Sequence, residues 1–152
     1  MRAALLLFAL AVPCAATPVH AMDTTPSSGP VKDADADSGR KAIEARDWKN
    51  AIENLNKAAS REPRNAEFQN LLGFAWRKSG NLELAFKYYN EALRLDVKHR
   101  GAHEYIGEAY LQVNNLAKAE EHLGALDELC VLPCGEYTEL RKAVDEYKRT
   151  RK

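Results

Sequence analysis

Residues 66–99 can be laid over the segments before and after them at a fixed step of 34 residues. Each copy reads as two amphipathic halves; in the middle copy these are AEFQNLLGFAWRKSG and NLELAFKYYNEALRLD, with Gly80 and Asn81 between them. Apolar residues recur at helical spacing in both halves, so each copy is predicted to form a helix, a turn and a second helix. Copies of this kind stack on their neighbours, and the chain is therefore predicted to be all-α.

The aligned columns support this prediction because each keeps one kind of side chain. Small residues recur where two helices must approach closely, and large apolar residues recur where the gaps between them must be filled. The small columns are Gly39, Gly73, Gly107 and Ala51, Ala85, Ala119, and the large ones include Leu55, Tyr89, Leu123 and Trp48, Leu82, Leu116.

With these residues the chain resembles the tetratricopeptide repeat family. The middle copy carries the family pattern in Leu72, Gly73, Trp76, Gly80, Ala85, Tyr89 and Ala92. Pro63 stands where the family expects proline, whereas Val97 and Val131 occupy that place in the later copies. The resemblance extends over about residues 38–130 and implies a helical-hairpin solenoid of three repeats.

The first copy departs from its sisters. Its first helix, over about residues 38–45, is predicted to be short, because Ser38 stands where the later copies have Leu72 and Ile106. In its turn Arg46 replaces Gly80 and Asn114, two residue types that tolerate a left-handed backbone. A different turn is therefore predicted there.

A capping helix is predicted over residues 136–149. Its apolar residues Tyr137, Leu140, Val144 and Tyr147 form one stripe on a charged cylinder. The stripe is in phase with the repeat, and no partner helix follows, since the chain ends in a basic tail at residues 150–152. A stack must close with a polar outer face. The predicted repeat domain, residues 38–149, thus has seven helices.

Residues 1–21 have the pattern of a secretory signal peptide. Arg2 gives a positive start, residues 3–12 are an apolar run, and Val19-His20-Ala21 offers a cleavage site. A membrane anchor needs ~20 apolar residues, and Pro13 ends this run too early. Lipidation at Cys14 is a second alternative, to which Pro13 is a poor fit. We expect cleavage after Ala21, no membrane span afterwards, and a periplasmic or secreted protein.

Residues 22–37 are predicted to be a disordered tether, because Thr, Pro, Ser, Gly and Asp cannot bury enough apolar surface to offset chain ordering. Asp33, Asp35, Asp37 and Glu44 have almost the spacing of a calcium loop. The required glycine is missing, however, because Ser38 stands in its place. The favoured interpretation is that Asp35, Asp37 and Ser38 cap the first helix.

No constellation for catalysis or for a cofactor is found. The 22 basic and 22 acidic residues are interleaved, which disfavours a nucleic-acid partner. His99 and His103 lie four residues apart, but HRGAHE lacks the glutamate placement of a zinc protease helix, so these two and His122 are interpreted as surface residues. Neither a nucleophile elbow nor a phosphate loop occurs, so no enzyme activity, cofactor or metal is expected.

Cys130 and Cys134 are the two cysteines that signal cleavage leaves. An oxidising compartment and the break at Pro133 predict that they form a disulfide between the third repeat and the cap. Their spacing differs from that of a thioredoxin-type motif. A periplasmic thiol/disulfide or metal-binding protein that uses these two cysteines is the alternative function.

The resemblance implies a concave groove lined by the first helix of each repeat. Its predicted partner-binding residues are Asn70, Phe74, Arg77 and Lys78 from the second copy, with Glu104, Glu108, Leu111 and Gln112 from the third. Phe74 is the candidate hot spot. Its alternative role is to pack against a neighbouring helix or the tether.

The predicted function is that of an exported adaptor which binds a protein or peptide segment in this groove. Relatives that clamp a C-terminal carboxylate use basic and Asn residues in this groove. Here Glu104 and Glu108 would repel a carboxylate, so that partner class is not expected. The sequence does not identify the partner, and we expect a monomer or weak oligomer. Glu136, Tyr137, Glu139 and Leu140 after the cysteine pair resemble the helix of small exported bacterial repeat proteins.

Overall fold

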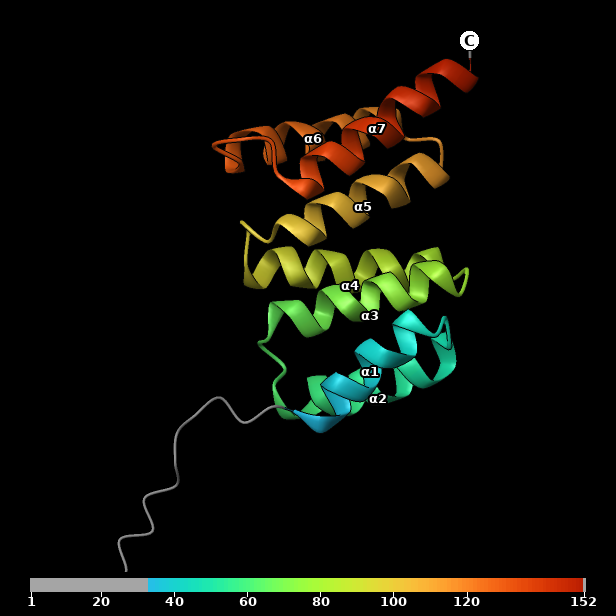
Figure 1. Ribbon diagram of the computed structural model, residues 1–152, viewed down its shortest axis with the longest axis vertical. Helices are drawn as coiled ribbons and strands as arrows, with labels where there is room; N and C mark the ends of the chain where they lie inside the picture. The colour runs from blue at the N-terminus through green and yellow to red at the C-terminus, as the bar shows by residue number, and fades with distance from the viewer. Residues whose placement is uncertain (1–32, 152) are drawn as a thin grey trace, which may run out of the picture. The chain divides into compact units, whose positions relative to one another are not determined.

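The computed structural model describes residues 33–151, which form seven α-helices (Figure 1). They are α1 (Ala34–Glu44), α2 (Trp48–Arg61), α3 (Ala66–Lys78), α4 (Leu82–Leu95), α5 (Arg100–Gln112), α6 (Leu116–Leu129) and α7 (Gly135–Thr150). Consecutive helices pair as hairpins, and α7 packs on α5 and α6. The predicted all-α solenoid of three repeats and a terminal helix is confirmed. The predicted signal peptide, its cleavage site, the lipidation alternative at Cys14 and nearly all of the predicted tether lie outside the described residues.

None of the helices within residues 33–151 has the length and apolar character needed to cross a membrane.

Each hairpin turns on one residue in the left-handed backbone region. These residues are Arg46 (φ 56°), Gly80 (φ 92°) and Asn114 (φ 61°). In the first hairpin the Arg46 N–H donates to the Ile43 carbonyl and the Asp47 N–H to the Ala42 carbonyl; the other two hairpins repeat both bonds. This arrangement satisfies carbonyls that the helix end leaves free. The prediction of a different first turn is therefore wrong, because Arg46 accepts the strained conformation.

The glycine column allows the two helices of a hairpin to approach each other. A Cβ atom built on Gly73 of α3 would lie 2.5 Å from Cδ1 of Tyr89 on α4, and one on Gly39 would lie 2.7 Å from Cγ of Leu55. Tyr89 and Leu55 are fully buried. In each of the first two hairpins, a large side chain of the second helix thus packs directly against a glycine of the first helix, as the repeat in the sequence predicts.

Ala85 also lies in this close-packed layer and has no exposed surface. We expect Ala85→Leu to lower the free energy of unfolding by about 2 kcal/mol, because the added atoms overpack the α3–α4 contact. Glu83→Leu, two residues earlier on the exposed face of α4, serves as the matched control. Urea denaturation compares them. An Ala85 variant no less stable than the Glu83 variant contradicts the packing register.

The third hairpin uses α7 to complete its glycine contact. A Cβ atom on Gly107 of α5 would lie 2.6 Å from Cδ2 of Leu140, so the close neighbour comes from α7. Leu140 and Val144 are buried against the stack. The opposite face of α7 carries the polar residues Thr138, Arg141, Lys142, Asp145, Glu146 and Arg149. α7 therefore closes the apolar stack with a polar surface.

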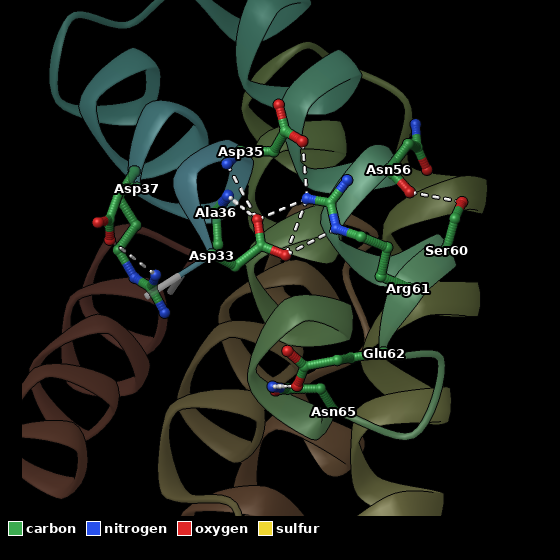
Figure 2. Close-up of polar contacts among 10 residues, drawn as sticks. Asp33, Asp35, Ala36, Asp37, Asn56, Ser60, Arg61, Glu62 and Asn65 are labelled. Carbon is green, nitrogen blue, oxygen red and sulfur yellow. Dashed lines mark hydrogen bonds and ion pairs between the residues drawn. The ribbon is translucent and has the colours of Figure 1, made fainter. Parts of the chain in front are cut away.

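The first helix begins earlier than predicted. Asp33 is the N-cap of α1, and its Oδ1 accepts from the N–H groups of Asp35 (2.9 Å) and Ala36 (3.0 Å). Residues 34–37 are therefore helical, not part of a tether, and Ser38 also lies inside the helix. Figure 2 shows Asp35 and Asp37 on α1. The predicted start was too late because Ser38, which stands where the later copies have an apolar residue, was interpreted as the first residue of a short helix.

Candidate functional site

The first helices of the hairpins follow one another along one side of the stack. α3 contacts both α1 and α5, and α5 contacts α7 (Figure 1). The eight residues predicted to line this side differ in burial. Lys78 and Gln112 are exposed; Phe74, Glu104 and Glu108 are half-buried; Asn70, Arg77 and Leu111 are buried. The last three are therefore not available as surface contacts for a partner.

Arg77 is an internal residue that joins three helices. Its side chain is 3% exposed, and Nη2 lies 2.6 Å from Oε2 of Glu108 on α5. Its Nε–H donates to the hydroxyl of Tyr89 on α4 at 3.3 Å. The guanidinium carbon also lies 5.6 Å from the centre of the Phe74 ring and 5.7 Å from that of Tyr105. Arg77 thus stabilises the floor of this face through an ion pair and two cation–π contacts.

Phe74 has internal partners on both sides. Its ring centre lies 4.9 Å from that of Tyr105 on α5 and 6.3 Å, edge to face, from that of Trp48 on α2. The Nζ of Lys78 lies 5.3 Å from the Phe74 ring centre. The alternative in which Phe74 packs against neighbouring helices is therefore observed, although part of the ring still faces solvent.

Carboxylates gather where α5 meets α7. Burial, together with the charges of Glu108, Glu136 and Glu139, raises the pKa of Glu104 to about 7, and Arg77 opposes this shift only weakly. Within residues 33–151, Glu108 pairs with Arg77 and Glu136 with Arg100, whereas Glu104 and Glu139 form no ion pair. This part of the face carries negative charge that is only partly compensated.

A pocket of about 380 Å³ opens beside Phe74, at the turn end of α1 and α3. Its lining consists of Ile43, Glu44, Arg46, Trp48, Phe74 and Lys78, and we call it the anchor pocket. Sequence reasoning missed the first four residues because it placed the groove on the second and third copies. The sequence did offer one signal for this pocket: Arg46 aligns with Gly80 and Asn114, where a residue that tolerates a left-handed backbone is expected.

Two of the histidines interpreted as surface residues are paired between α5 and α6. Nδ1 of His103 lies 3.0 Å from Nδ1 of His122, and Nε2 of His103 lies 3.0 Å from the Val97 carbonyl. A carbonyl can only accept, so His103 carries its proton on Nε2 and accepts at Nδ1 from the His122 Nδ1–H. Burial, with the nearby His103, lowers the pKa of His122 to about 4. The interpretation as surface residues is wrong for His103, which is buried.

His99 has a different task. It is the N-cap of α5, where Nδ1 accepts from the Ala102 N–H at 3.1 Å. Its Nε2 lies 3.2 Å from Oε2 of Glu67 on α3, and this contact raises the pKa of His99. The side chain therefore links the second and third hairpins.

Cys130 and Cys134 lie at the two ends of the segment between α6 and α7, paired through their sulfur atoms with their Cα atoms 5.8 Å apart. Val131 and Leu132 between them are largely exposed. Within residues 33–151, no group of three or more His, Cys, Asp or Glu side chains is placed to hold a metal ion.

The acidic run at the start of α1 is engaged by the protein itself. Nη2 of Arg61 on α2 lies 2.6 Å from Oδ1 of Asp33 and 2.6 Å from Oδ2 of Asp35 (Figure 2). The hydrogen bond from Arg61, and after it the one from the Ala36 N–H, hold the pKa of Asp33 below its usual range. Asp33 and Asp35, two of the four carboxylates with the spacing of calcium ligands, thus tie the start of α1 to the end of α2.

Comparison with known proteins identifies the fold and the repeat. Residues 37–98 match the family model of the tetratricopeptide repeat. The comparison with curated proteins finds no match. Among solved structures, the TPR2B domain of yeast Sti1 in its pHsp70 complex is 21% identical with a TM-score of 0.70, covering 77% of this chain and 95% of that chain.

Two further structures share the fold. The Sgt2 TPR domain from Aspergillus fumigatus is 21% identical with a TM-score of 0.70, covering 80% of each chain. The Yersinia enterocolitica type III secretion chaperone SycD, in complex with a peptide of the translocator YopD, is 19% identical with a TM-score of 0.67, covering 78% of this chain and 92% of that one. With the recurring columns and the hairpin stack, these matches show that residues 37–98 carry the tetratricopeptide repeat pattern and that the stack of residues 33–151 has the fold of such repeats.

Proposed function

We propose that this protein is an exported interaction adaptor that binds a protein segment with basic side chains across α3, α5 and α7. The observation that carries the proposal is the set of carboxylates around Glu104, whose pKa is raised to about 7 by burial and by Glu108, Glu136 and Glu139. A lysine or arginine from a partner relieves this repulsion and gains charge-assisted hydrogen bonds.

The relatives support a peptide-binding role for the fold. Solved complexes of similar structure contain pHsp70 with Sti1 and a YopD peptide with SycD. The electrostatics of this chain favour a basic segment over an acidic one, because Glu104 and Glu139 have no counter-charge among residues 33–151.

Export is supported by the pattern of residues 1–21 and by the paired cysteines, since disulfides persist in oxidising compartments. The intact mass of the protein from the cell envelope tests it. We expect a chain that begins at Met22, and a mature species that still carries Met1 would contradict export by cleavage after Ala21.

Binding is tested with the double variant Glu104→Gln, Glu139→Gln. Partners are captured from the envelope fraction, and a synthetic segment of the captured protein is titrated by calorimetry. At pH 8, above the pKa of Glu104, we expect the double variant to bind about tenfold more weakly, which corresponds to ~1.4 kcal/mol from the lost negative charge. Phe74→Ala and Arg77→Ala are unsuitable here, because both side chains hold helices together.

The matched control is Glu83→Gln, Glu128→Gln. Both residues are exposed and lie on the second helices α4 and α6. Their substitution by glutamine removes the same formal charge as the test variant. We expect this variant to bind like the wild type. Equal weakening by both variants means that net charge alone attracts the partner, and no weakening by either contradicts the proposed face.

The cysteine pair is proposed to be a structural disulfide and not a catalytic one. Reduction should release the start of α7, because Cys134 is its N-cap and forms no side-chain cap hydrogen bond. Hydrogen exchange with and without reductant is expected to lose protection within residues 135–150, while α3 and α4 keep theirs. Unchanged exchange rates, or free thiols in the native protein, would contradict this role and favour the thiol alternative.

A further inference from the structure

We propose that the anchor pocket receives one apolar side chain of the partner segment together with a carboxylate beside it. The inference rests on the proposed function and specifies the chemistry of one end of the bound segment. The pocket adjoins α1 and α3, whereas the carboxylates around Glu104 adjoin α5 and α7. The bound segment is thus acidic and apolar at one end and basic at the other.

The apolar part of the pocket is formed by two aromatic side chains in edge-to-face contact. Trp48 and Phe74 meet edge to face with their centres 6.3 Å apart, and Ile43 completes the wall. All three side chains are half-buried, so each keeps part of its apolar surface accessible. A phenyl or branched aliphatic group can cover that surface, and an aromatic pair of this kind favours a third ring in offset or edge contact.

The charged part of the pocket favours an anion. Arg46 and Lys78 are exposed cations that form no ion pair within residues 33–151, and Glu44 is the single acidic residue of the lining. The C-terminal ends of α1 and α3 adjoin the pocket and their dipoles oppose an anion, although backbone N–H groups satisfy the carbonyls of Ala42, Ile43, Trp76 and Arg77. An anion therefore depends on Arg46 and Lys78. The excess of one positive charge therefore acts on the ligand.

The backbone of Arg46 gives an independent reason. The turn demands φ near +56°, which glycine and asparagine supply in the sister hairpins and which is unfavourable for arginine. No hydrogen bond or ion pair of the Arg46 side chain within residues 33–151 explains why arginine stands there. Strain at a residue that also lines a pocket points to a binding task for its side chain.

The test uses the two tryptophans as reporters. The protein has two indole N–H groups, that of Trp48 in the pocket and that of Trp76 outside its lining, and Trp76→Phe assigns their signals in a ¹H–¹⁵N spectrum. N-acetylphenylalanine is titrated against its amide. We expect the acid to shift the Trp48 signal saturably and the Trp76 signal hardly at all, and the amide to bind at least threefold more weakly.

Arg46→Gly is the matched variant, because glycine is the residue of the second hairpin and relieves the strain. We expect it to raise Tm while reducing the preference for the acid over the amide to near unity. A merely structural role for Arg46 would raise Tm and leave that preference unchanged, which would overturn the proposal. A silent Trp48 signal, equal binding of acid and amide by the wild type, or parallel shifts of both indoles would also overturn it.

The two proposals fail separately. Capture that depends on Glu104 and Glu139, together with a silent Trp48 signal, refutes the anchor pocket and leaves the adaptor function. A pocket that binds the acid in a protein whose capture is unaffected by the Glu104 and Glu139 changes refutes the proposed face.

Discussion

Arg77→Met should lower the free energy of unfolding by about 3 kcal/mol, one of the two largest effects we expect in this chain. The substitution leaves the Glu108 carboxylate without its partner at 2.6 Å and the Tyr89 hydroxyl without its donor. Breaking a buried ion pair by removing one partner costs ~3–5 kcal/mol, and the lower end applies here because Glu108 keeps some exposure. Chemical denaturation followed by circular dichroism measures the loss.

Lys78→Met is the control, since it removes a positive charge from the adjacent, exposed position. We expect that variant to stay within ~0.5 kcal/mol of the wild type. Adding Glu108→Leu to Arg77→Met should restore part of the stability, because the stranded carboxylate is then gone. Equal costs for the Arg77 and Lys78 variants would contradict the internal position of Arg77.

The burial of Arg77 could have been predicted from the repeat itself. Its column at a step of 34 residues contains Ile43 and Leu111, both apolar, and Leu111 is buried. The family resemblance instead assigned the column to the groove surface, and the charge of Arg77 supported that assignment. The partners that make the burial tolerable, Glu108 and Tyr89, belong to other helices, so the sequence offers no local sign of them.

The helices and their order were predictable because each depends on spacing within about a dozen residues. The Cβ contacts at Gly39 and Gly73 follow the same rule, since glycine and its large neighbour recur in every copy. Gly107 shows where this rule ends. Its close neighbour is Leu140 of α7, because the last repeat packs on the capping helix. The aligned columns predict Leu123 of α6 in this place, and they do not show which of the two leucines lies closer.

Parts of the candidate site depend on contacts between helices and could not be predicted. His103 and His122 are 19 residues apart, and neither lies in a column of similar residues. The anchor pocket combines the end of α1, the start of α2 and the end of α3. The turn of the first hairpin joins the first two, but α3 reaches them through the angle between the first and second hairpins, which the repeat pattern does not encode.

Two of the groups so assembled have pKa values shifted in opposite directions. Burial, then Glu108, Glu136 and Glu139, raises the pKa of Glu104 from 4.5 to about 7, against Arg77. Burial, then His103 and Lys118, lowers the pKa of His122 from 6.5 to about 4, against Glu121. Each shift alone makes stability depend on pH.

Together the two groups should nearly cancel between pH 4.5 and 6.5. In the unfolded chain His122 holds a proton there and Glu104 does not; in the folded chain Glu104 holds it and His122 does not. Both states bind one proton at these two sites, so the pair adds no slope to the stability curve. The slope should appear when either group is replaced.

Glu104→Gln should make the protein more stable than the wild type above pH 7, where the wild type carries a carboxylate that the fold disfavours. Because the folded-state pKa of this acid is raised, the wild-type penalty is full above pH 7 and absent below pH 4.5. After a discount for solvent screening, the gain at high pH is about 2 kcal/mol. Denaturation midpoints at a series of pH values should show the difference vanish toward pH 4.5.

His122→Asn should have the opposite pH dependence. Asparagine can still donate to Nδ1 of His103 but does not titrate, and the lost stacking on Tyr110 lowers stability at neutral pH. Because the folded-state pKa of His122 is lowered, the wild type loses about 2 kcal/mol relative to this variant as pH falls from 6.5 to 4, again discounted for screening. The wild type and the His122 variant should therefore converge in acid, whereas the wild type and the Glu104 variant diverge at high pH. Parallel curves for all three proteins would mean that neither group titrates in the folded chain as its surroundings require.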